Sequence, residues 1–121
     1  MTKFNEYNEQ FWEAIDSLLA NNKIVIDRPR GSVHPRFTNL KYEVDYGYVE
    51  GTKSMDGGGI DVWLGSLPDK KANAIICTVD LMKKDSEIKL VIGCTEQEMK
   101  VVYDFCNNSE FMKGILIRRF S

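Results

Sequence analysis

The sequence predicts an α+β fold in which a small, mostly antiparallel sheet is partly closed into a barrel and flanked by two helices. Three observations carry this prediction. Apolar residues recur at helical spacing near the N-terminus, a capping box starts a second helical segment at Thr95, and short segments elsewhere alternate with the two-residue period of strands. The 121 residues are the size of one domain, 1–121, and 43% of them are hydrophobic, which is enough for a core.

The first helix is predicted over Phe4–Ala20. Asn21 and Asn22 end it, because asparagine tolerates the left-handed conformation that closes helices. A short strand is predicted at Lys23–Asp27, and a turn-rich passage separates it from one strand, or a bent pair of strands, at Tyr42–Val49. The helix prediction depends on apolar side chains spaced three and four residues apart on one face: Phe4, Tyr7, Phe11, Ile15, Leu18 and Leu19.

The second half of the chain predicts a strand at Ile60–Leu64 and a hairpin that joins Ala74–Leu81 to Ile88–Gly93. Thr95, with Glu98 three residues later, forms the capping box of a helix that runs through Cys106. A last strand is predicted at Gly114–Phe120. This order of elements predicts an OB-like β-barrel, small and partly closed.

Charge and cysteine content exclude several classes of protein. A net charge of -2 and a pI of about 5.4 argue against a general binder of nucleic acid or membrane surfaces. A magnesium–phosphate complex, which carries its own counter-cation, suits a weakly acidic protein. Cys77, Cys94 and Cys106 include no C-x-x-C pair and are predicted to be buried, reduced thiols. The absence of a signal segment and of long apolar runs predicts a cytoplasmic protein with no membrane partner.

Histidine and glycine patterns exclude other chemistries. His34 is the one histidine, so a zinc site built from several histidines is impossible, and no G-x-S-x-G elbow accompanies it. His34 is predicted to be a turn or packing residue. Residues 57–59 are three consecutive glycines, but no G-K-[ST] follows them, so they are not a P-loop.

Two groups of carboxylates remain as candidates. Asp56 and Asp61 flank the three glycines, where the backbone can fold tightly enough for both side chains to bind a magnesium ion. The alternative is a solvated hairpin turn, although Asp61 lies inside a predicted strand, where a negative charge is poorly suited. Asp80, Glu87 and Lys89 lie on the faces of the hairpin opposite its apolar side chains, which is also the pattern of an ordinary solvent-facing sheet.

Three segments resemble motifs of the soluble (family I) inorganic pyrophosphatases. Residues 42–52, YEVDYGYVEGT, resemble the family's Y-P-x-N-Y-G-[FY]-[IV]-P-x-T, and residues 56–62, DGGGIDV, resemble D-G-D-P-x-D-V. Met82, Asp85 and residues 87–90, EIKL, stand where the family has a methionine, an aspartate and D-x-K-[IL]. The resemblance extends from Tyr42 to about Gly93, and the chain resembles a shortened, divergent member of the family.

This resemblance implies divalent-metal-dependent hydrolysis of inorganic pyrophosphate, or of another small diphosphate, with Mg²⁺ as the metal and Mn²⁺ as an alternative. A homo-oligomer is compatible with it. It implies that the metal ligands are Asp56, Asp61, Asp85 and Glu87. The catalytic residues that it implies are Asp56, Asp61, Tyr46 and Asp45.

The resemblance also implies a set of phosphate-binding residues. Lys89 and Tyr42 belong to it, together with an arginine that precedes the Tyr-Gly segment. Arg28 lies in a pair that resembles the family's D-R, whereas Arg30 lies in a stretch that resembles its P-K-G-S. Arg28, Arg30 and Arg36 therefore all remain candidates for this role.

One position departs from the family pattern in a way that affects function. Gly58 stands in place of the central aspartate that binds metal and activates the attacking water. Asp45, where the family has asparagine, or Glu50, near its proline, is a candidate substitute. The departure leaves a third alternative, which is a non-catalytic domain that binds metal–phosphate ligands.

Overall fold

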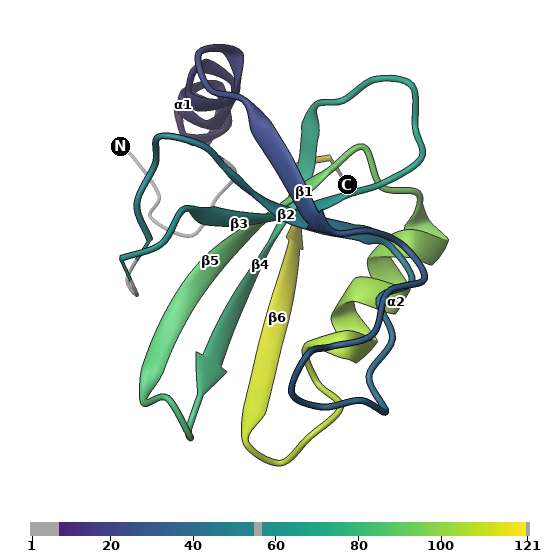
Figure 1. Ribbon diagram of the computed structural model, residues 1–121. Coiled ribbons are helices and arrows are strands. Elements are labelled where there is room, and N and C mark those ends of the chain that lie inside the picture. The colour runs from purple at the N-terminus through teal and green to yellow at the C-terminus, as the bar shows by residue number, and fades with distance from the viewer. Residues whose placement is uncertain (1–7, 55–56, 121) are drawn as a thin grey trace.

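The computed structural model describes residues 8–54 and 57–120, and it confirms the α+β class (Figure 1). No helix within these two ranges is long and apolar enough to cross a membrane. The elements follow in the order α1 (Glu9–Ala20), β1 (Ile24–Arg28), β2 (Asp45–Val49), β3 (Ile60–Leu64), β4 (Ala72–Asp80), β5 (Asp85–Ile92), α2 (Glu96–Phe105) and β6 (Met112–Arg118).

The six strands form one sheet in the order β1-β2-β3-β5-β4-β6. Every neighbouring pair is antiparallel except β3 and β5, which run parallel with Val62 opposite Leu90. One parallel pair among antiparallel ones agrees with the mostly antiparallel sheet that was predicted, and it arises because β5 returns between β3 and β4. Among the described residues β1 and β6 remain separate edges, so closure of the sheet into a barrel is not confirmed.

Each face of the sheet is covered by one helix. Trp12 and Ile15 of α1 pack against one face, and Met99 and Val102 of α2 pack against the other. Figure 1 shows the two helices on opposite sides of the sheet. Because consecutive strand residues face opposite ways, Val62 belongs to the first core and Trp63 to the second.

The helix α2 changes the environment expected for the polar face of the hairpin. This face was expected to be the one away from the core, yet its Thr78 is 4% exposed and its Lys89 is 8% exposed. On the opposite face Val79 is 52% exposed. Burial follows from the position of the helices, which strand alternation alone does not determine. The candidate functional residues of β5 therefore lie beside a core.

The local signals at the helix ends agree with the structure. Thr95 Oγ1 accepts from the Glu98 N–H at 3.1 Å and Glu98 Oε1 accepts from the Thr95 N–H at 2.8 Å, so the predicted capping box is confirmed. Asn8 caps α1, and the predicted start of that helix at Phe4 lies outside the described residues. All three cysteines are free.

Gly47 allows β1 to approach β2 closely. A Cβ atom built on Gly47 would overlap the backbone oxygen of Val25 and lie 2.8 Å from the Ile26 Cα. We expect Gly47→Ala to lower the free energy of unfolding by about 3 kcal/mol, because backbone atoms cannot move aside as a flexible side chain can. Urea denaturation measures the loss.

Gly114→Ala is the matched control for this prediction. Gly114 also lies in a strand, but the atoms nearest to its added Cβ are at 3.2–3.3 Å. The free energy of unfolding should therefore fall less in Gly114→Ala than in Gly47→Ala. Equal unfolding midpoints for Gly47→Ala and the unsubstituted protein would show that β1 and β2 separate at little cost.

Candidate functional site

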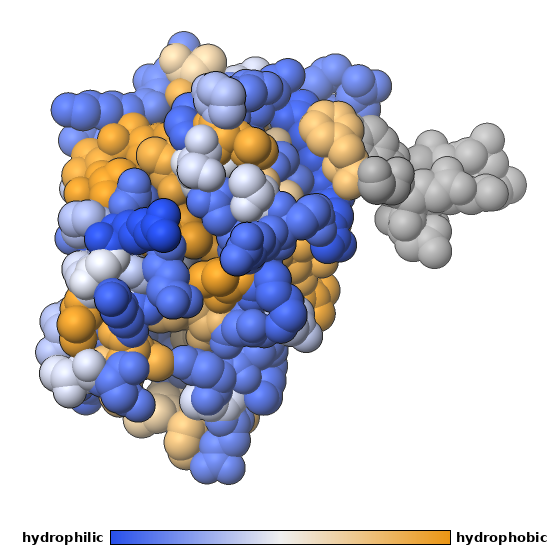
Figure 2. Space-filling model, turned by 90° about the vertical axis from the view of Figure 1, so that its right-hand side faces the viewer, coloured by the Kyte–Doolittle hydropathy of each residue, from blue (hydrophilic) through white to orange (hydrophobic). Residues whose placement is uncertain are grey.

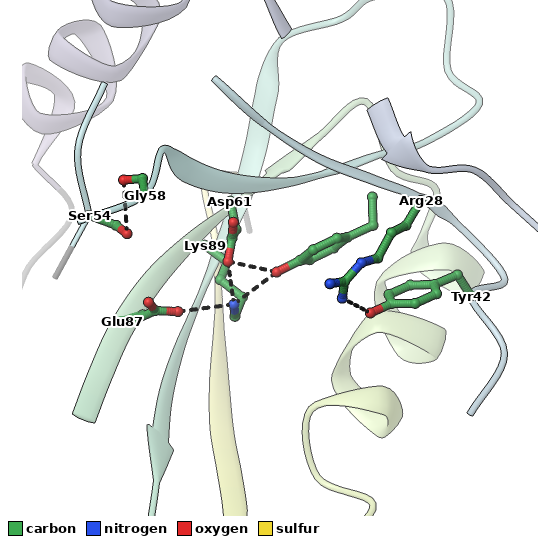
Figure 3. A network of polar contacts seen from close by, with 8 residues as sticks. Arg28, Tyr42, Ser54, Gly58, Asp61, Glu87 and Lys89 are labelled. Atoms are coloured by element: carbon green, nitrogen blue, oxygen red, sulfur yellow. Dashed lines mark hydrogen bonds and ion pairs between the residues drawn. The ribbon is translucent and has the colours of Figure 1, made fainter. Parts of the chain in front are cut away.

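Four polar side chains from three strands contact one another on the face covered by α2 (Figure 3). Lys89 Nζ donates to Asp61 Oδ2 at 2.8 Å, to Tyr46 Oη at 3.0 Å and to Glu87 Oε2 at 3.1 Å. Tyr46 Oη donates to Asp61 Oδ2 at 2.7 Å. We call these four residues the Lys89 cluster. It brings together two predicted metal ligands, Asp61 and Glu87, the predicted phosphate ligand Lys89, and Tyr46, which was predicted with Asp61 to be catalytic.

Strand register explains how these side chains meet. Trp63 of β3 lies opposite Tyr46 of β2 and opposite Val91 of β5. Asp61 and Lys89 each precede one of these paired residues by two positions, so both side chains face the same way as the Trp63 ring. The parallel pairing of β3 with β5 is thus what places Asp61 beside Lys89.

The Lys89 cluster is largely shielded from solvent and carries a net negative charge. The side chains of Glu87, Lys89 and Asp61 are 9%, 10% and 26% exposed. Burial opposes the charge of Lys89, but the neighbouring Tyr46 and Asp61 oxygens outweigh it and raise its pKa. Burial also raises the pKa of Tyr46, with Lys89 opposing and Asp61 adding to the effect. Lys89 therefore remains an ammonium and Tyr46 a protonated donor throughout the physiological range.

One oxygen of the cluster has no hydrogen-bond partner among the described residues. Glu87 Oε2 accepts from Lys89, whereas Glu87 Oε1 is buried and accepts no hydrogen bond. Leaving a charged acceptor buried and unsatisfied is costly, so such an atom needs an explanation in a bound water or ion. A carboxylate oxygen is also the kind of ligand that magnesium prefers.

The carboxylates fit a particular mode of magnesium binding. No group of three or more potential metal-ligating side chains occurs within residues 8–54 and 57–120. Asp61 and Glu87, both bonded to Lys89, are the two carboxylates of the cluster. Magnesium is commonly held by one or two carboxylates, with water and substrate phosphate completing its coordination. The donor set thus suits a metal that arrives with, or is completed by, a phosphate ligand.

A second cation lies next to the cluster. Arg28, opposite Tyr46 in the β1–β2 pair, donates from Nη1 to Tyr42 Oη at 2.6 Å. Its guanidinium carbon lies 5.6 Å and 5.9 Å from the ring centroids of Tyr42 and Tyr46, and Lys89 Nζ lies 5.5 Å from the Tyr46 centroid. Arg28 and Lys89 therefore border the same aromatic ring. Figure 3 shows Arg28 and Tyr42 to one side of Asp61 and Lys89.

The other two candidate arginines are placed differently. The exposed Arg30 contributes its backbone N–H, which donates to Asp45 Oδ1 at 2.7 Å. Arg36 lies in the loop between β1 and β2, with its guanidinium carbon 6.0 Å from the centroid of Phe37. Of the three arginines, Arg28 is the one that the structure brings against Tyr46.

The remaining predicted site residues lie outside the Lys89 cluster. Asp45 and Tyr46 are consecutive in β2, so their side chains face opposite ways, and the Asp45 carboxylate accepts from the Arg30 N–H. Asp85 starts β5, opposite Asp80 in the hairpin and two residues before Glu87. Asp56 lies outside the described residues. The roles predicted for these three residues remain predictions.

Trp63 supports the cluster, although no motif in the sequence had indicated a role for it. Its ring centroid is 4.6 Å from that of Tyr46 and 5.8 Å from that of Tyr42, and the residue is 1% exposed. Its position two residues after Asp61 in a predicted strand was the available signal, because it places both side chains on one face.

A hollow of about 900 Å³ lies mainly on the opposite face, against α1. Its lining is mostly apolar and includes Phe11, Ile15, Ile88 and Ile115. Glu87 is the one member of the Lys89 cluster that borders it. The converging charges are in the cluster, which we therefore take as the candidate site.

Comparisons of the chain with known protein families, with curated proteins and with solved structures found no match.

Proposed function

We propose that this protein hydrolyses inorganic pyrophosphate to phosphate in a divalent-metal-dependent reaction in the cytoplasm, with Mg²⁺ as the metal and Mn²⁺ as an alternative. One observation carries the proposal. Glu87 Oε1, which is buried and has no hydrogen-bond partner among the described residues, lies in a cluster with a second carboxylate, Asp61, and a buried ammonium, Lys89. Carboxylates for a metal and cations for phosphate are the two donor types that a metal–phosphate complex needs.

The resemblance of residues 42–93 to the soluble inorganic pyrophosphatases supports the same conclusion, because the motif residues Tyr46, Asp61, Glu87 and Lys89 are those that contact one another. An OB-like, partly closed barrel is part of this proposal. The mostly antiparallel sheet, with β5 between β3 and β4, supports it.

The proposed roles follow from the chemistry of each side chain. Asp61 and Glu87 hold the metal, with Asp56 and Asp85 as further proposed ligands. When bound, the metal lowers the pKa of a water and neutralises charge on the phosphates. Lys89 and Arg28 bind phosphate oxygens, and Tyr46 positions Asp61 by donating to Oδ2.

Lys89 has a specific requirement in this scheme. Its three N–H groups are directed to Asp61, Tyr46 and Glu87. The ammonium can turn a proton toward phosphate only when its hold on the two carboxylates weakens, and neutralisation of those carboxylates by a cation has that effect. A divalent cation and phosphate should consequently bind more tightly together than either binds alone.

Phosphate release from pyrophosphate tests the proposal. We expect release with Mg²⁺ or Mn²⁺ and only the uncatalysed background with a chelator. Because no central aspartate activates the water, turnover should be about 10²–10⁴-fold slower than with a positioned general base. Metal-independent release, or none with any divalent metal, would contradict the proposed reaction.

Gly58 favours a second candidate, a domain that binds metal–phosphate ligands without hydrolysing them. Calorimetry with magnesium pyrophosphate separates the two, since the binding domain gives heat of binding without phosphate release. A hydrolase of a different small diphosphate is the third candidate, and a panel of diphosphates identifies it. Gly58→Asp should increase pyrophosphate hydrolysis if the missing carboxylate limits the rate.

A further inference from the structure

The segment 28–41 has an unusual charge. Four of the chain's 16 lysines and arginines and none of its 18 acidic residues lie there, so the segment carries +4 while the rest of the chain carries −6. Its basic residues are Arg28, Arg30, Arg36 and Lys41. Like charges repel one another, so their concentration in one loop of an acidic protein indicates an anionic ligand.

Backbone hydrogen bonds hold this loop against the candidate site. The Gly31 N–H donates to the backbone carbonyl oxygen of Tyr42 at 2.7 Å, and the Tyr42 N–H donates to the backbone carbonyl oxygen of Ser32 at 2.8 Å. The side-chain hydroxyl of Tyr42 also accepts a hydrogen bond from Arg28, which borders Tyr46 of the Lys89 cluster. The loop is therefore attached to the same tyrosine that positions Arg28.

His34 lies between two of the loop's cations. Its Nδ1 accepts from the N–H groups of Arg36 at 3.0 Å and Phe37 at 3.1 Å, which confirms the turn residue that was predicted. Its ring stacks on Tyr42 with centroids 6.2 Å apart and an angle of 13°. Arg28 Nη1 donates to the hydroxyl of the same tyrosine, so a row runs from Arg28 through Tyr42 to His34, and the backbone N–H of Arg36 bonds to the His34 end of this row.

The cations around His34 are not held in ion pairs with other described residues. In the part of the chain that the structure describes, Arg28, Arg36 and Lys83 form no ion pair. Burial lowers the pKa of His34, and the positive charges of Arg28, Lys83 and Arg36 lower it further. A nearby polyanion would reverse the second effect.

The loop between β1 and β2 lies on the side of the molecule that carries α2 (Figure 1). Hydrophilic side chains cover much of that side, with separate apolar areas between them (Figure 2). The surface suits a strongly charged ligand better than an extended apolar one.

We infer that the site takes a chain of three phosphates, with two bound at Lys89 and Arg28 and the third bound along His34 and Arg36. The inference rests on the proposed function and extends its substrate class from diphosphates to triphosphates, inorganic or nucleoside. A diphosphate engages Lys89 and Arg28 and leaves Arg36 unused, whereas a third phosphate pairs with its guanidinium.

Hydrolysis of such a chain balances with one water. The water oxygen bonds to the terminal phosphorus, the bridging oxygen leaves with the electron pair, and phosphate and a diphosphate are formed. The protons of the water end on these two products.

The single histidine makes binding directly observable. Nuclear magnetic resonance of the His34 imidazole is recorded with Mg²⁺ and with ligands whose bridging oxygens are replaced by NH, so that no turnover occurs. It compares the analogues of tripolyphosphate, pyrophosphate and adenosine triphosphate with sulfate at equal ionic strength. We expect tripolyphosphate to raise the pKa of His34 and to bind at least tenfold more tightly than pyrophosphate. Arg36→Gln should weaken tripolyphosphate binding about tenfold and leave pyrophosphate binding unchanged. Lys23→Gln, which removes an exposed lysine outside the loop, is the control of equal charge.

The outcomes separate this inference from the proposed function. Tripolyphosphate binding that depends on Arg36 supports the inference even if no pyrophosphate is hydrolysed. Equal affinity for pyrophosphate and tripolyphosphate, an Arg36→Gln variant no weaker than Lys23→Gln, or an equal response to sulfate overturns it. A stronger response to adenosine triphosphate than to tripolyphosphate identifies the nucleoside form as the ligand.

Discussion

Asp61→Asn is expected to reduce phosphate release from pyrophosphate to the level measured without metal. Asp61 Oδ2 accepts from both Tyr46 and Lys89, and the remaining Asn oxygen can still accept from one of them. The substitution therefore removes a negative charge needed for a divalent cation while it preserves much of the shape. Phosphate release over a range of Mg²⁺ concentrations measures the effect, and circular dichroism checks the fold.

Asp104→Asn is the matched control for that experiment. This variant also loses a carboxylate that is bonded to a lysine, because Asp104 accepts from Lys100 at 2.8 Å, but this pair is exposed on α2. Such exposed pairs contribute little to stability, so the activity and stability of Asp104→Asn should be those of the unsubstituted protein. If the unsubstituted protein and Asp61→Asn release phosphate equally at every metal concentration, the catalytic proposal is wrong and the binding domain replaces it.

Lys89→Met is expected to lower the free energy of unfolding by ~3–5 kcal/mol at neutral pH, because it leaves two carboxylates without their counter-charge. The raised pKa of Lys89 means that its charge stabilises the fold fully at every pH below its ordinary value and is lost only in strong alkali. Urea denaturation at neutral pH measures the loss.

A second substitution keeps this prediction testable if Lys89→Met folds poorly. Glu87→Gln combined with Lys89→Met removes one positive and one negative charge, so it should recover part of the lost stability. A double variant no more stable than Lys89→Met would show that packing around the Lys89 chain, not charge, accounts for the defect.

The sequence predicted the elements that depend on local signals. The capping box at Thr95 and the hairpin of β4 and β5 are confirmed, because hydrogen bonding within four residues and strand alternation determine them. The pairing of β3 with β5 was not predicted, since no local signal distinguishes a parallel neighbour from an antiparallel one. The position of α2 over the polar face depends on long-range packing for the same reason.

For the candidate site, alternation and motif order predicted that Asp56, Asp61, Glu87 and Lys89 face one cleft with Tyr46 close by. The contacts among Asp61, Glu87, Lys89 and Tyr46 agree with this, whereas Asp56 lies outside the described residues. Alternation and motif order did not distinguish Arg28 from Arg30, because both fit a motif and only the β1–β2 register places one opposite Tyr46. The alternation of Asp45 and Tyr46 could have been used to separate those two side chains in advance.

The pairing of β3 with β5 also determines when the site forms during folding. The hairpin of β4 and β5 closes over a short loop, but Lys89 meets partners that lie 28 and 43 residues earlier in the chain. Non-local contacts form slowly because the entropy of closing a long loop is lost before any contact compensates for it. Asp61 therefore meets the ammonium late, and a partly folded chain with an intact hairpin has Glu87 and Lys89 but neither Asp61 nor Tyr46 in reach.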